Sequence, residues 1–130
     1  MSQTQPAPSI LLIEKDDVTL DIYQRELSKS FTVFAFLNPG GVLETLANRD
    51  IQAVVIEPEI ASGEGWGLID AIHNTFPDRS IPVVVCSTRD ASHLSAHKNI
   101  VKYLTKPVLP NTLRKVILEV LTGWEMIKKI

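Results

Sequence analysis

The segment SILLIEKDDVTL, residues Ser9–Leu20, decides the fold class of this chain. It opens with a short and nearly continuous apolar run, which is typical of a strand buried on both faces of a parallel sheet. Four charged residues, Glu14, Lys15, Asp16 and Asp17, follow at once, and either aspartate can cap a helix. The segment therefore predicts a buried strand that leads through a charged turn into a helix.

The same alternation of strand and helix repeats along the chain. Four further runs are rich in β-branched or aromatic residues and short enough for strands, namely Thr32–Phe36, Ala53–Glu57, Pro82–Ser87 and Val101–Thr105. The spacing of apolar residues predicts five helices, which begin near Asp16, begin at Asn38-Pro39, surround Trp66–Phe76, cover Arg89–Lys98 and follow Leu109. This alternation predicts an α/β domain, a five-stranded parallel sheet with helices on both faces. The alternative is an α+β domain with an antiparallel edge strand.

The composition bounds the number of domains and excludes several classes of protein. The 130 residues carry 13 Lys+Arg and 15 Asp+Glu, for a net charge of −2, and 45% of them are hydrophobic. This length predicts one domain. There is no basic excess to favour direct nucleic-acid binding, and no apolar run of ~20 residues to span a membrane. The single cysteine, Cys86, cannot form an internal disulfide, which fits a reducing cytoplasm.

The sequence divides into three parts. Residues 1–8 are polar, lack a signal-peptide pattern and are interpreted as a disordered lead-in. Residues 9–122 carry all the predicted strands and helices of the domain. Residues 123–130 are interpreted as a C-terminal tail or as an extension of the last helix.

Polar residues follow four of the predicted strands at the point where each strand ends. They are Glu14-Lys15, Glu57, Ser87-Thr88 and Thr105-Lys106. Because the carboxyl ends of parallel strands lie along one edge of the sheet, where ligands bind, we expect these carboxylates, ammonium groups and hydroxyls to share one pocket. The alternative is that each strand simply ends in solvent and a polar residue follows.

Five motifs in the right order and spacing resemble the receiver domain of bacterial response regulators, the CheY-like domain of two-component phosphorelay signalling. They are ILLIEKDD, AVVIE, Gly65 eight residues after Glu57, IPVVVCST and KYLTKP, and they span about Ser9 to Leu121. The resemblance implies a flavodoxin-like, doubly wound sheet with the strand order 2-1-3-4-5.

The resemblance also implies a role for each matching residue. Glu57 takes the phospho-acceptor position, Lys106 and Ser87 the phosphoryl-binding positions, Ser87 and Tyr103 the switch positions, and Glu14 and Lys15 the metal-binding acidic pocket. The family also commonly has a cis peptide bond at the position of Lys106-Pro107.

Three substitutions depart from the family pattern at this site. Glu57 replaces an aspartate, and its extra methylene moves the carboxylate by more than ~1 Å, which can cost ~10²-fold in rate. Lys15 replaces the acid that ligates Mg²⁺ directly, and an ammonium group repels a cation. Pro58 removes a backbone N–H beside the acceptor position. Asp16 is either a substitute for the lost metal ligand or a cap of the following helix.

The charges suggest what replaces the family's metal. Glu14 and Glu57 against Lys15 and Lys106 balance without an ion, so we expect no cofactor and weak or absent Mg²⁺ binding. Glu57 is then held by Lys106, by Lys15 or by both. The alternative for Lys15 is that its side chain points to solvent, which still leaves the direct metal ligand absent. Two interpretations stay open: the lysines lock the domain in one signalling state, or sequence drift has disabled the site.

The sequence thus predicts a receiver-like signalling domain that is not an enzyme and that acts in the cytoplasm through contacts with proteins. The expected partners are a histidine kinase or an output protein, with no nucleic acid and no membrane. A homodimer through the fourth helix, fifth strand and fifth helix is a further expectation. Two alternatives are an orthodox Mg²⁺-dependent receiver that accepts phosphate on Glu57, and a small-ligand sensor that uses the same pocket.

Overall fold

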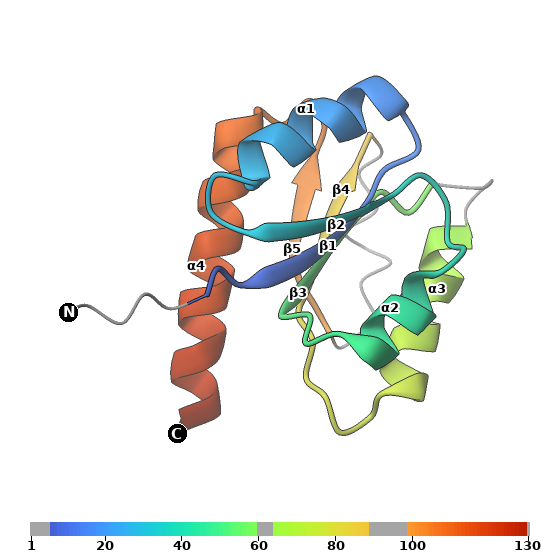
Figure 1. Ribbon diagram of the computed structural model, residues 1–130, viewed down its shortest axis with the longest axis vertical. Helices are drawn as coiled ribbons and strands as arrows, with labels where there is room; N and C mark the ends of the chain where they lie inside the picture. The colour runs from blue at the N-terminus through green and yellow to red at the C-terminus, as the bar shows by residue number, and fades with distance from the viewer. Residues whose placement is uncertain (1–5, 60–63, 89–98, 130) are drawn as a thin grey trace.

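A single parallel sheet organises the chain. The computed structural model describes residues 6–59, 64–88 and 99–129, those from 124 on as helix backbone only. The strands are β1 (Ser9–Ile13), β2 (Thr32–Phe36), β3 (Ala53–Ile56), β4 (Val83–Ser87) and β5 (Ile100–Thr105). All neighbours are parallel and the order is β2-β1-β3-β4-β5 (Figure 1), which confirms the predicted sheet and its strand order.

Helices cover both faces of the sheet. Within the described part of the chain they are α1 (Asp17–Leu27), α2 (Val42–Asn48), α3 (Glu64–Thr75) and α4 (Pro110–Lys129). Residues of α1 and α4 pack on one face, and residues of α2 and α3 pack on the other. Four of the five predicted helices are therefore present in the described part of the chain. The fifth, predicted over Arg89–Lys98, lies outside the described residues. Among the helices described, none has the length and apolarity needed to cross a membrane.

Strand β1 is apolar at successive positions because both of its faces are buried. Successive side chains of a strand point to opposite faces of the sheet. Leu11 and Ile13 join the core under α2 and α3, whereas Ile10 and Leu12 join the core under α1 and α4. Each of these side chains is at most 1% exposed. Burial of ~1.5–3 kcal/mol per side chain on two faces gives this strand a strong preference for the centre of the sheet.

Helix α2 begins later than the sequence predicts. The Asn38 side chain does not cap a helix but accepts a hydrogen bond from the Gly40 N–H at 2.9 Å, closing a local turn. The helix starts at Val42, after Gly41, which has a φ of +86°. Glycine adopts this conformation without the steric penalty of a β-carbon. The turn closed by Asn38 therefore displaces the start of the helix.

Helix α3 packs closely against the chain that leaves β3. Gly65 is buried, and a β-carbon at this position would lie 2.5 Å from the Cα of Pro58. Only a hydrogen atom fits there, so the glycine allows the helix to approach the backbone of Pro58. This contact supports the residues that immediately follow Glu57.

Tyr23 ties α1 to the segment that joins β5 and α4. Its hydroxyl donates a hydrogen bond of 2.9 Å to the carbonyl of Val108, and the side chain is 5% exposed. The carbonyl follows the cis peptide bond between Lys106 and Pro107, which the family resemblance implies. The hydrogen bond thus holds the loop beside Lys106 against α1.

We expect Tyr23→Phe to lower the free energy of unfolding by ~0.5–1.5 kcal/mol, because the Val108 carbonyl loses its donor. Urea unfolding followed by tryptophan fluorescence measures this loss. Tyr103→Phe is the matched control, since the buried Tyr103 hydroxyl has no hydrogen-bond partner among the residues that the structure describes. The control should leave the stability unchanged or raise it. Equal losses in the two variants would contradict the assigned role of Tyr23.

Candidate functional site

Three of the predicted site residues sit one position beyond the end of a strand. The backbone N–H groups of Glu14, Glu57 and Lys106 donate to β2, β1 and β4 at 3.0, 2.9 and 2.8 Å. The sheet ladder therefore continues through each of these residues and fixes where each side chain starts. All three lie at the carboxyl edge of the sheet, as the strand-end pattern predicts.

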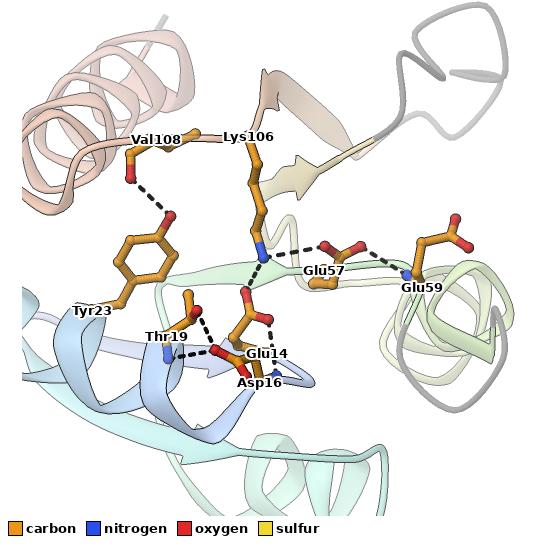
Figure 2. A network of polar contacts seen from close by, with 8 residues as sticks. All are labelled: Glu14, Asp16, Thr19, Tyr23, Glu57, Glu59, Lys106 and Val108. Atoms are coloured by element: carbon orange, nitrogen blue, oxygen red, sulfur yellow. Dashed lines mark hydrogen bonds and ion pairs between the residues drawn. The ribbon is translucent and has the colours of Figure 1, made fainter.

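The three side chains meet in one buried cluster, which we call the carboxylate–lysine cluster: Glu14, Glu57 and Lys106. Glu14 is 2% exposed and Glu57 is 1% exposed, and the Lys106 side chain is 13% exposed. Figure 2 shows the Lys106 ammonium between the two carboxylates. Its Nζ donates a hydrogen bond to Glu14 Oε1 and lies 3.2 Å from Glu57 Oε1. The pocket predicted from the strand ends therefore exists for these residues.

Backbone donors hold the other carboxylate oxygens. The N–H of Asp16 donates to Glu14 Oε2 at 3.1 Å, and the N–H of Glu59 donates to Glu57 Oε2 at 3.0 Å. The remaining oxygen, Glu57 Oε1, is buried and accepts no hydrogen bond from the described residues, although the Lys106 ammonium group is near enough to form an ion pair. When all three side chains are ionised, two negative charges face one positive charge. The cluster then carries a net charge of −1 rather than the predicted balance.

The ionisation of Lys106 reflects two opposing effects. Burial lowers the pKa of the ammonium group, while the hydrogen bond and charge of Glu14 and the charge of Glu57 raise it. The carboxylates outweigh burial, so the pKa of Lys106 lies above its usual value of 10.5. Lys106 is therefore a permanent cation across the physiological pH range.

Lys15 does not join the cluster. Its side chain is exposed, and the ion pairs found among the described residues do not include it. Of the alternatives left open by the sequence, Glu57 is thus paired with Lys106 and not with Lys15. This explains the net charge of the cluster, because the ammonium group of Lys15 forms no ion pair with the buried carboxylates among the described contacts.

Asp16 caps the N-terminus of α1. It is the N-cap residue, and its Oδ2 accepts hydrogen bonds from the N–H of Thr19 at 2.9 Å and from its hydroxyl at 2.5 Å. These hydrogen bonds lower the pKa of the Asp16 carboxyl. The structure therefore supports the helix-cap interpretation of Asp16. Across the part of the chain that is described, no three His, Cys, Asp or Glu side chains are grouped to hold a metal ion.

Ser87 and Tyr103 lie on the neighbouring strands β4 and β5, and of the two the Ser87 carbonyl contacts the cluster, by accepting from the Lys106 N–H. Ser87 ends β4 and is 1% exposed, and Tyr103 lies on β5. The Tyr103 ring contacts Trp66 of α3, with ring centroids 6.3 Å apart and an interplanar angle of 32°. Burial raises the pKa of the Tyr103 hydroxyl. The ring therefore packs towards α3, on the α2–α3 side of the sheet.

Sequence reasoning missed the backbone donors of Asp16 and Glu59. The donor of Glu59 could have been predicted from Pro58. Because proline has no N–H, the first backbone N–H after Glu57 is that of Glu59. The loss of the N–H at Pro58 therefore does not leave Glu57 without a backbone donor. The donor of Asp16 follows from the tight turn after β1, which the order of residues alone does not specify.

Comparison with known proteins identifies the fold. The structure matches the CheY-like receiver domain from Methanospirillum hungatei JF-1, with a TM-score of 0.81, 21% identity, and 92% and 98% of the two chains covered. It also matches the receiver domain of an HD-domain-containing protein from Pseudomonas fluorescens Pf-5, with a TM-score of 0.80, 23% identity, and 92% and 98% coverage.

The sequence comparisons reach less far. No protein-family model matches the chain. The chain is 23% identical over 119 residues to the hybrid signal transduction protein dokA of Dictyostelium discoideum, which is 90% of this chain and 7% of that protein. It thus spans a small part of the curated relative it matches. Together with the solved structures, these results show that the chain has the fold of response-regulator receiver domains.

Proposed function

We propose that this chain is a receiver-like signalling domain of a two-component or phosphorelay pathway that acts by protein–protein contact without efficient phosphorylation. The observation that carries the proposal is the position of Lys106 between Glu14 and Glu57, with Lys15 exposed. Lys106 takes a position that the family also fills with lysine, so the difference from the family is that an exposed Lys15 stands where the direct metal ligand would be. In this proposal the carboxylate–lysine cluster holds the domain in one signalling state.

Two features argue against phosphoryl transfer to Glu57. Transfer depends on positioning and on neutralising the charge of the phosphoryl group, which the family achieves with Mg²⁺. Here the two buried carboxylates share one ammonium group, Asp16 is a helix cap, and Lys15 takes the place of the direct ligand. Glu57 also has a longer side chain than the aspartate of the family, and both of its oxygens face groups of the protein. These residues do not fit a magnesium site, so we propose weak or absent Mg²⁺ binding and no enzymatic activity.

We expect no phosphoryl adduct when the wild-type chain is incubated with acetyl phosphate and Mg²⁺ and analysed by intact mass. The double variant Lys15→Asp/Glu57→Asp restores both family residues. It should form an adduct at least ~10²-fold faster than the wild-type chain, because the metal ligand and the acceptor geometry return together. Glu57→Asp alone is the matched control and should stay largely unmodified, since it still lacks the ligand.

A stoichiometric adduct on the wild-type chain would overturn the proposal and support the orthodox receiver. Titration with Mg²⁺, followed through Trp66 fluorescence, separates the two steps. A saturable change in the wild-type chain would contradict the proposed loss of metal binding. A change confined to the double variant would support it.

The partners proposed for this domain are a histidine kinase or an output protein in the cytoplasm. Homodimer formation through the predicted fourth helix, β5 and α4 remains part of the proposal, and residues 89–98 of that face lie outside the described residues. Analytical ultracentrifugation of the chain tests the dimer.

A further inference from the structure

A cavity of about 470 Å³ lies between α1 and the segment that joins β5 to α4. Its lining residues are Thr19, Ile22, Tyr23, Thr88, Lys106, Pro107, Val108 and Pro110. The volume lies within the ~300–1,000 Å³ that is usual for small-molecule sites. The cavity shares only Lys106 with the carboxylate–lysine cluster, so it is a neighbouring space rather than the same site.

The walls of the cavity are apolar and held in place. Ile22 and Tyr23 contribute one wall from α1, and Pro107, Val108 and Pro110 contribute the other. The hydrogen bond from the Tyr23 hydroxyl to the Val108 carbonyl joins the two walls, and Figure 2 shows this contact close to Lys106. Two proline rings further restrict the backbone of the second wall. The space is therefore preformed, which reduces the entropic cost of binding a ligand.

Most polar groups in the lining already have partners inside the protein. The Thr19 hydroxyl donates to Asp16, the Tyr23 hydroxyl donates to Val108, and the Lys106 ammonium donates to Glu14. Thr88 directly follows β4 and is exposed. Its hydroxyl is the group of the lining best placed to exchange a hydrogen bond with water for one with a ligand.

The charges around the cavity disfavour ligands of either sign. Among the described residues that line the cavity, Lys106 is the charged one, and its ammonium group repels a cation. Its ammonium group is already paired with Glu14 and Glu57, so an anion would have to compete with two buried carboxylates for it. A neutral ligand avoids both penalties and leaves the buried ion pairs intact.

We propose that this cavity binds an uncharged small molecule with an apolar ring and one hydroxyl group. The ring packs against the apolar lining beside the hydrogen bond that joins Tyr23 to Val108, with Ile22 and Pro107 as its walls, and the ligand hydroxyl bonds to Thr88. The site goes beyond the proposed function, because it requires neither phosphorylation nor a protein partner. Failure of either proposal leaves the other unaffected.

Three probes that share one ring test the proposal by two-dimensional NMR of the full chain. Benzyl alcohol is neutral, benzoate is an anion and benzylamine is a cation at pH 7. We expect benzyl alcohol to give saturable shifts at the amides of Thr19, Ile22, Tyr23, Thr88 and Val108, and the two charged probes to bind at least ~10-fold more weakly. No saturable shift with benzyl alcohol, or equal binding of all three probes, would overturn the proposal.

A matched pair of substitutions on α1 tests the location. Ile22→Trp fills the cavity from an exposed position and should weaken benzyl alcohol binding at least ~10-fold. Val18→Trp is the control, because Val18 lies one turn earlier and does not line the cavity. Ile22 is 48% exposed and Val18 is 63% exposed, so both variants should fold, which the same spectra report. Undiminished binding to Ile22→Trp would place the probe elsewhere and refute the site.

Discussion

Lys106→Met is expected to lower the free energy of unfolding by about 3–5 kcal/mol, which is the usual cost of removing one partner of a buried ion pair. Methionine keeps an unbranched apolar stem that is one atom shorter than the lysine side chain and removes the charge. Glu14 and Glu57 then remain buried without their shared cation, at 2% and 1% exposure. Urea unfolding at pH 7, followed by tryptophan fluorescence, measures the loss.

Lys102→Met is the matched control for this prediction. Lys102 lies on β5, the strand that Lys106 directly follows, but its side chain is exposed. Its replacement should change the stability by no more than ~0.5 kcal/mol. If the two variants lost the same amount, the buried cluster would not be the origin of the effect.

Neutralising the carboxylates should recover part of the loss. In Glu14→Gln/Glu57→Gln/Lys106→Met, the buried charges disappear together, and such replacements are often close to neutral in stability. The difference between wild type and Lys106→Met also depends on pH. Because the pKa of Lys106 is raised above 10.5 in the folded state, its stabilisation is complete below that pH and is lost as the pH rises through the folded value. The difference should therefore shrink above about pH 10.5 and persist near neutrality.

Gly65→Ala is expected to destabilise the domain by ~1–3 kcal/mol, because a methyl group would have to enter space that the backbone of Pro58 occupies. The new carbon would lie 2.5 Å from Pro58 Cα and 2.7 Å from its carbonyl oxygen. Backbone atoms cannot rotate away as the end of a side chain can. Helix α3 or the segment after β3 must shift, and this shift should change the NMR signal of the Glu59 amide, which donates to Glu57.

Gly67→Ala provides the control on the same helix. A β-carbon at Gly67 would meet no atom within 4 Å, and alanine is the better helix former by ~1 kcal/mol. This variant should therefore be more stable than the wild type, with an unchanged Glu59 signal. Comparable destabilisation in both variants would indicate a loss of helical structure rather than a clash with Pro58.

The secondary structure and the strand order were predictable from the sequence where they depend on the order of apolar residues within one strand or helix. Leu11 and Ile13 alternate with Ile10 and Leu12 on a strand that is apolar on both faces, and such a strand belongs in the middle of a parallel sheet. The start of α2 was predicted wrongly because Asn38 closes a turn with Gly40 instead of capping a helix. In a helix cap and in a local turn alike, the Asn38 side-chain oxygen accepts a hydrogen bond from a backbone N–H. The positive φ of Gly41 shows that the chain forms the turn.

The membership of the candidate site was only partly predictable. The sequence by itself determined that Glu14, Glu57 and Lys106 would meet, because each follows a strand of one parallel sheet and such strands share a carboxyl edge. It did not determine whether the neighbouring Lys15 would join them. Only the tertiary structure decided that the sheet hydrogen bond of the Glu14 N–H keeps Glu14 at the buried edge while Lys15 lies exposed. The ammonium group that pairs with Glu14 belongs instead to Lys106, which is 92 positions later in the chain. No local pattern of residues specifies a contact over that separation.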